Sequence, residues 1–153
     1  MMKKIMMSLL IGVAVLTGFS CYAAVPADQL VLGGIRHGAT IREVESVYGR
    51  PGKMERDVKV YGEKLEYEYG DTLEFEFING KVTKIQADDS SNAKTQAGIG
   101  LGSDVAALKN AYGEPDAVHG EDYIYYASGL QGIGLKFEVK YGRVAEIKCG
   151  PLY

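Results

Sequence analysis

Two stretches of the chain alternate strictly between apolar and charged side chains. In residues 65–69 and 73–77, leucine, tyrosine and phenylalanine alternate with glutamate. A period of two places one set on each face of a strand, as in an antiparallel sheet that is solvated on one side. Asn79-Gly80 follows and is typical of a tight hairpin turn. The sequence therefore predicts antiparallel strands whose charged face carries four glutamates: Glu66, Glu68, Glu74 and Glu76.

Before these strands, apolar side chains recur at helical spacing between residues 41 and 48. Thr40 is a natural N-cap, and Glu43 three residues later completes a capping box. Gly49 and Pro51 then end the helix. A helix of this length is not stable alone, so we expect it to lie against the sheet.

The chain also contains an internal duplication. The stretch IRHGATIREVESVYGRP at 35–51 resembles IGLGSDVAALKNAYGEP at 99–115, and LEFEFINGKVTKI at 73–85 resembles LKFEVKYGRVAEI at 135–147. The second copy predicts a helix over 105–112. We therefore expect the fold class α+β, with two tandem repeats, each a short helix followed by an antiparallel β-meander. The two sheets would be joined into one curved face.

The polar stretch DDSSNAKTQA separates the two copies and reads as a linker. The predicted domain organisation follows from it: residues 24–87 form the first helix-plus-meander repeat, residues 88–97 the linker and residues 98–153 the second repeat.

Residues 1–23 have the features of a secretory signal peptide. Lys3 and Lys4 precede an apolar run, and Cys21-Tyr22-Ala23 is a small-x-small site, so we expect cleavage after Ala23. Cys21 would be the lipidated residue of a lipoprotein signal, but of the three residues before it only Ser20 fits, so we expect no lipid anchor. Other apolar runs are too short to cross a bilayer. The mature chain is expected in the periplasm or outside the cell.

Net charge and cysteine content further narrow what the protein can bind and how its fold is stabilised. The formal net charge of −3 argues against nucleic-acid binding, which needs a basic surface. Cleavage after Ala23 leaves Cys149 as the single cysteine, so no intramolecular disulfide can form.

The combination of turn, cap and hairpin residues resembles a known family. The residues concerned are Gly38, Thr40, Val44, Gly49, Pro51, Phe77, Gly80, Val82 and Ile85. This pattern resembles the SmpA/OmlA (BamE-like) family of the outer-membrane β-barrel assembly machinery. The tandem arrangement resembles the secreted β-lactamase inhibitor proteins. The resemblance implies a non-catalytic protein-binding module of the cell envelope, with a secreted enzyme inhibitor as the alternative.

Motifs for catalysis are sparse. The sequence has no nucleophile elbow, no zinc-protease motif and no phosphate loop. A weaker hypothesis is a small hydrolase, which would need Cys149 and His119 brought together. His37 and His119 are the only histidines, and we expect surface or loop roles for them. We predict no enzyme, no cofactor and no metal site.

The two copies differ on one face of one strand, where Ile124 and Tyr126 replace the first copy's glutamates. Tyr123 and Tyr125 already occupy the core-facing positions, so this strand is apolar on both faces. Either another part of the chain covers the second face, such as residues 22–32 or 150–153, or it is open for a partner.

The candidate binding residues are Ile124, Tyr126, Glu66, Glu68, Glu74, Glu76, Lys136 and Glu138. The glutamates could hold a cation or a basic partner. The favoured alternative is a solvated face relieved by cross-strand lysines such as Lys84. The expected partner is a protein of the envelope or of the extracellular space.

Overall fold

A computed structural model describes residues 24–153. The helical elements are a 3-10 turn, η1 (Ala27–Gln29), and two α-helices, α1 (Ile41–Tyr48) and α2 (Val105–Tyr112). The strands are β1 (Val31–Leu32), β2 (Ile35–Arg36), β3 (Lys53–Lys59), β4 (Gly62–Tyr69), β5 (Leu73–Ile78), β6 (Lys81–Ala87), β7 (Ala117–His119), β8 (Asp122–Tyr126), β9 (Ile133–Lys140) and β10 (Arg143–Pro151). The predicted signal peptide and Cys21 lie outside the described residues.

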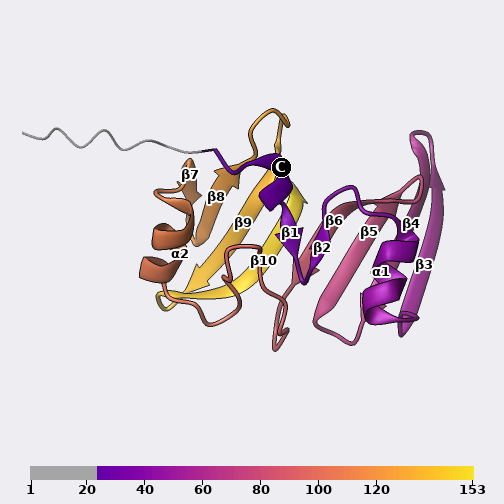
Figure 1. The fold of residues 1–153 in the computed structure, drawn as a ribbon, viewed down its shortest axis with the longest axis horizontal. Coiled ribbons are helices and arrows are strands. Elements are labelled where there is room, and N and C mark those ends of the chain that lie inside the picture. Colours follow the sequence, from indigo (N-terminus) through magenta and orange to yellow (C-terminus); the bar gives the residue numbers. More distant parts are fainter. Residues whose placement is uncertain (1–23) are drawn as a thin grey trace, which may run out of the picture.

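Eight of the strands form one antiparallel sheet in the order β3-β4-β5-β6-β10-β9-β8-β7. Figure 1 shows β3 at one end of this sheet and β7 at the other, with β6 and β10 side by side between them. β1 and β2 form a separate two-stranded sheet. The chain thus builds the large sheet in two runs of strands that meet at β6 and β10.

Both predicted helices are confirmed, and α1 has the capping box expected of Thr40 and Glu43. The Thr40 side chain accepts a hydrogen bond from the Glu43 N–H, and the Glu43 carboxylate accepts one from the Thr40 N–H. In α2 the Asp104 carboxylate accepts from the N–H of Ala107 at 2.7 Å. The last residue of each helix is a tyrosine that packs on the sheet.

The two helices pack on the same face of the large sheet. The Tyr48 ring of α1 lies 5.4 Å from the Phe75 ring of β5, and the Tyr112 ring of α2 lies 5.7 Å from the Phe137 ring of β9. Phe75 and Phe137 are both fully buried and belong to one continuous core cluster. Figure 1 shows both helices and the β1–β2 sheet in front of the large sheet.

The predicted fold class is wrong. We expected an α+β protein of two helix-plus-meander repeats, but the described chain is mostly β, with two eight-residue helices and one eight-stranded sheet. The class differs because β3 and the β1–β2 sheet add strands that the sequence pattern did not predict. At the junction of the two halves, Ile85 of β6 pairs with Cys149 of β10 and Ala87 pairs with Ile147. These four residues are fully buried, so strands from both halves share one sheet and one core. The folding unit is the whole sheet.

The segment before β1 is held against the distant end of the sheet. The Val25 N–H donates to the Tyr126 carbonyl at 3.0 Å, and the Ser128 N–H donates to the Val25 carbonyl at 2.8 Å. Val25 and Leu30 are both buried in the core. Within residues 24–153, no helix combines the length and the apolar character that crossing a membrane requires.

Candidate protein-binding surface

The sheet has a second face, which we call the outer face, on the side opposite α1 and α2. Successive side chains of a strand point to opposite faces, so the residues that alternate with the buried Tyr67, Phe75 and Phe137 lie on the outer face. All eight predicted binding residues lie on this face: Glu66, Glu68, Glu74, Glu76, Ile124, Tyr126, Lys136 and Glu138. The helices leave this face uncovered, and most of its side chains are charged.

Lysines neutralise the four glutamates. Lys64 Nζ contacts Glu66 Oε1 and Glu76 Oε2, each at 2.9 Å. The hydrogen bonds that the ammonium group donates to these two carboxylates raise the pKa of Lys64. Lys84 contacts Glu74 at 2.7 Å, and Lys53 contacts Glu68 at 2.8 Å. This arrangement matches the favoured alternative of a solvated, ion-paired face, since each carboxylate has a nearby ammonium group.

The charged residues of the second half are paired in the same way. Lys136 Nζ donates to Asp122 Oδ2 at 2.9 Å, and Glu138 contacts Lys140 at 3.0 Å. The outer face therefore carries a network of cross-strand and same-strand ion pairs. Because its charges are paired, they do not strongly favour a basic or an acidic partner.

Ile124 and Tyr126 differ in their exposure. Ile124 is 5% exposed, and its cross-strand neighbours are Ala117 of β7 and Lys136 of β9. Tyr126 is 38% exposed and lies opposite Gly134, which has no side chain to cover the ring. Of the two predicted residues, Tyr126 is available to a partner, whereas Ile124 is covered by its own sheet.

The C-terminal residues approach this part of the outer face. A Cβ added to Gly134 would lie 2.8 Å from the Leu152 side chain, and the Leu152 N–H donates to the Gly132 carbonyl at 2.9 Å. Of the other predicted cover, residues 22–32, the structure describes residues 24–32, which contact β8 through the backbone of Val25. Tyr126 keeps its exposure beside both segments.

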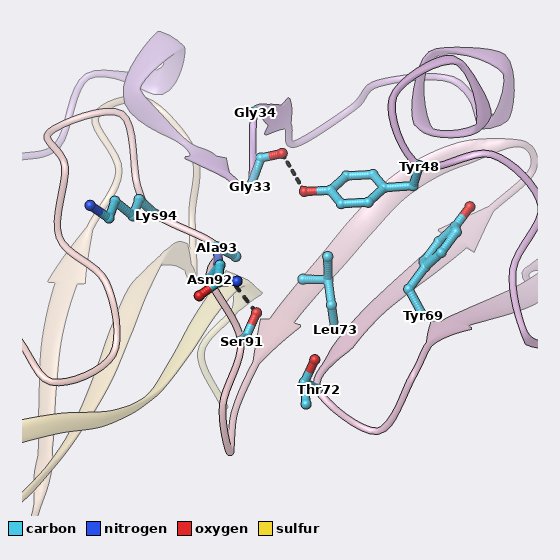
Figure 2. Close-up of a pocket in the computed structure, with 10 residues that line it drawn as sticks. All are labelled: Gly33, Gly34, Tyr48, Tyr69, Thr72, Leu73, Ser91, Asn92, Ala93 and Lys94. Carbon is cyan, nitrogen blue, oxygen red and sulfur yellow. Dashed lines mark hydrogen bonds between the residues drawn. The ribbon is translucent and has the colours of Figure 1, made fainter.

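A cavity of about 500 Å³ opens on the opposite face, between the turn after β1, helix α1 and the segment before Gly98. Figure 2 shows the Tyr48 and Tyr69 rings on one side of it and Ser91, Asn92 and Ala93 on the other. The Lys94 side chain extends away from the two rings (Figure 2).

The polar groups of these two tyrosines are already engaged. The Tyr48 hydroxyl donates to the Gly33 carbonyl, and the Tyr69 hydroxyl donates to the Gly49 carbonyl at 2.9 Å. Burial raises the pKa of Tyr48 and raises that of Tyr69 to about 12, so both phenols are neutral near pH 7. The tyrosines tie the turn and the helix end together, and neither supplies an ionised base to the cavity.

The structure does not bring Cys149 and His119 together. Cys149 is fully buried on β10, and His119 is exposed on β7, three strand spacings or roughly 14 Å away across the sheet. Burial raises the pKa of the Cys149 thiol to about 12, which disfavours the thiolate. The specific pair that the hydrolase hypothesis required is therefore not assembled.

His37 lies near the β1–β2 sheet, and burial lowers the pKa of its imidazole. Within the part of the chain that the structure describes, no group of three or more His, Cys, Asp or Glu side chains has the geometry to hold a metal ion.

Sequence reasoning missed one exposed feature, the hairpin of β3 and β4. Every residue of β3 is exposed, and the hairpin carries four exposed large apolar side chains: Met54, Val58, Val60 and Tyr61. Residues 53–59 read KMERDVK, whose polar character gave no strand signal. Met54 and Val58 are the only apolar residues among these seven, too few to show the alternation of a half-buried strand.

Comparisons with models of protein families, with curated proteins and with solved structures found no match for this chain. The resemblance to the SmpA/OmlA family and to the β-lactamase inhibitor proteins therefore stays a prediction.

Proposed function

We propose that this chain is an exported, non-catalytic protein-binding module of the cell envelope, and that its partner sits on the outer face around Tyr126. The observation that carries the proposal is the exposure of Tyr126 on a sheet face that neither helix covers. Tyrosine is among the residues that most often anchor protein interfaces, because its ring offers a large contact area with a polar tip.

The surroundings of Tyr126 support an interface with a protein. Tyr126 lies opposite Gly134, which carries no side chain of its own, and the ring remains 38% exposed although Leu152 lies close to Gly134. The charged residues nearby are ion-paired, as Lys136 is with Asp122, so a partner can cover them without leaving a bare charge buried. An aromatic anchor with a polar rim is the usual arrangement of a protein–protein interface.

Site-specific photo-crosslinking in the native host tests this proposal. A benzoylphenylalanine at position 126 should form an adduct of discrete mass with a partner protein. The same group at position 141, an exposed tyrosine in the turn between β9 and β10, is the matched control and should not form that adduct. Absence of any adduct at 126, or identical adducts at both positions, would contradict the proposal.

A further inference from the structure

Strand β3 forms one edge of the large sheet and is exposed along its whole length. Among residues 24–153 it pairs only with β4, and Figure 1 shows its other side free of further strands. An edge strand of seven residues presents a row of unpaired backbone groups, which another extended segment can pair with.

The free backbone groups belong to Met54, Arg56 and Val58. The Asn79 N–H donates to the Glu63 carbonyl at 2.9 Å, so the backbone groups of Glu63 point towards β5. Alternate residues of a strand bond to opposite neighbours, and Val58 lies opposite Glu63. The N–H and C=O of Val58 therefore point away from the sheet, as do those of Arg56 and Met54.

The side chains of β3 divide between its two faces. Met54 is 56% exposed and Val58 is 80% exposed, and both lie on the same face as Arg56. The outer face carries charges in the order positive, negative, negative, positive, from Lys53, Glu55, Asp57 and Lys59. The edge thus combines free backbone groups, two exposed apolar side chains and a defined charge order.

This charge order disfavours pairing with a second copy of the chain. In the antiparallel register of full overlap, Lys53 would lie opposite the Lys59 of a second copy, and Glu55 would lie opposite its Asp57. In a parallel pairing in register, every charge would lie opposite itself. Like charges directly opposed destabilise a sheet, so the pattern disfavours self-association of β3 in these two fully overlapping registers.

The same pattern specifies a different occupant by charge complementarity. We propose that β3 is a docking edge for an extended segment of another protein, which adds to the sheet as a further strand. This segment carries acidic residues opposite Lys53, Arg56 and Lys59, basic residues opposite Glu55 and Asp57, and apolar residues against Met54 and Val58. The order acidic-apolar-basic-acidic-basic-apolar-acidic is the same in either direction, so it suits parallel or antiparallel addition.

The present partners of these charges do not prevent docking. Arg56 contacts Glu63 at 3.3 Å and Lys53 contacts Glu55 at 2.8 Å, and all four side chains are about half exposed. Exposed pairs of this kind are weak and re-form readily with a new partner. The edge is at the opposite end of the strand order from β8, so this inference does not depend on the role of Tyr126.

Two synthetic peptides test the inference against the chain 24–153. The first, Glu-Val-Lys-Glu-Lys-Val-Glu, carries the complementary order, and the second, Lys-Val-Glu-Lys-Glu-Val-Lys, carries the reversed charges. By fluorescence anisotropy the first should bind about tenfold more tightly or better, because five cross-strand charge pairs change sign. Equal binding of both peptides, or no binding of the first up to millimolar concentration, would overturn the inference.

Two variants separate backbone pairing from charge. Val58→Pro removes an N–H that points to solvent but no charge, at a position where proline is tolerated on an edge strand, so melting should be unchanged and binding of the first peptide lost. The double change Lys53→Glu, Lys59→Glu keeps the backbone and should shift preference towards the second peptide. Unchanged binding by a folded Val58→Pro protein, or unchanged preference in the double variant, would refute edge docking.

Discussion

Ile124 of β8 lies directly opposite Lys136 of β9 on the outer face of the sheet, and Ile124 is nearly inaccessible to solvent. The Lys136 ammonium group donates to Asp122, two residues before Ile124 on the same strand. An apolar side chain in this charged face is thus covered by its neighbours on the sheet. This relationship distinguishes Ile124, which stabilises the fold, from Tyr126, which is available for binding.

Truncation of these two residues should therefore have different effects on stability. Ile124→Ala removes buried methyl groups and should lower the free energy of unfolding by about 2 kcal/mol. Tyr126→Ala changes a partly exposed position and should cost less than about 1 kcal/mol. Urea denaturation followed by circular dichroism measures both. A larger loss of unfolding free energy for Tyr126→Ala than for Ile124→Ala would contradict the assignment of Ile124 as the covered residue of the two.

The close approach of β8 and β9 at Gly134 predicts a second stability effect. A Cβ at Gly134 would lie 2.1 Å from the Tyr125 carbonyl oxygen, which is backbone and cannot move aside. Gly134→Ala should therefore destabilise the protein by about 2 kcal/mol.

Gly52→Ala is the matched control, since the nearest atom to its added Cβ is 3.7 Å away, and it should cost less than about 0.5 kcal/mol. Thermal melting of both variants gives the comparison. Equal melting temperatures would mean that the strands separate freely at Gly134.

The helices could be predicted from sequence because their signals are local. The start and the end of α1 depend on Thr40, Glu43 and Gly49, which all lie within ten residues of one another. The turn at Asn79-Gly80 depends on these two residues alone, and both have positive φ angles. The pairing of Ile85 with Cys149 joins residues far apart in sequence and has no local signal, so the place of β10 beside β6 could not be predicted. The fold class was predicted wrongly because strands such as β3 were not recognised. β3 was missed because an exposed edge strand needs no apolar face.

The candidate site could be predicted in part, because local alternation decides on which face of the sheet a side chain lies. Alternation placed Tyr126 and the glutamates on the outer face, as the register has them. Burial of Ile124 depends on Ala117 and Lys136 across two strand pairs, which the sequence of β8 alone does not encode.

The capping box predicts a pH dependence for α1. Hydrogen bonds from Thr40 hold the pKa of Glu43 below its ordinary value of 4.5. The capping stabilisation should therefore be complete above pH 4.5 and be lost as the pH falls through the lower folded-state pKa.

Thr40→Ala should cost about 1 kcal/mol at pH 7. Glu43→Gln should destabilise at pH 7 and have a progressively smaller effect below pH 4.5, as chemical denaturation at several pH values would reveal. An effect of Glu43→Gln that is independent of pH would rule out the ionised carboxylate as the capping group.

The burial of Cys149 predicts slow thiol chemistry in the folded protein. Its pKa is raised to about 12 from an ordinary value of 9.0, because burial disfavours the thiolate. Ellman's reagent at pH 8 should label the chain 24–153 only as fast as it unfolds, and rapidly in denaturant. Stability should also decline as the pH rises above about 9, since the unfolded thiol ionises first. Rapid labelling of the native chain would refute this burial.

The affinity of the partner captured at position 126 tests most directly whether a protein partner is bound through Tyr126. Titration calorimetry of this partner with the wild-type chain, Tyr126→Ala and Tyr141→Ala gives the comparison. Loss of an anchoring tyrosine should cost about 2 kcal/mol, or roughly 30-fold in Kd, whereas Tyr141→Ala should leave Kd unchanged. An unchanged Kd for a folded Tyr126→Ala protein would contradict the account.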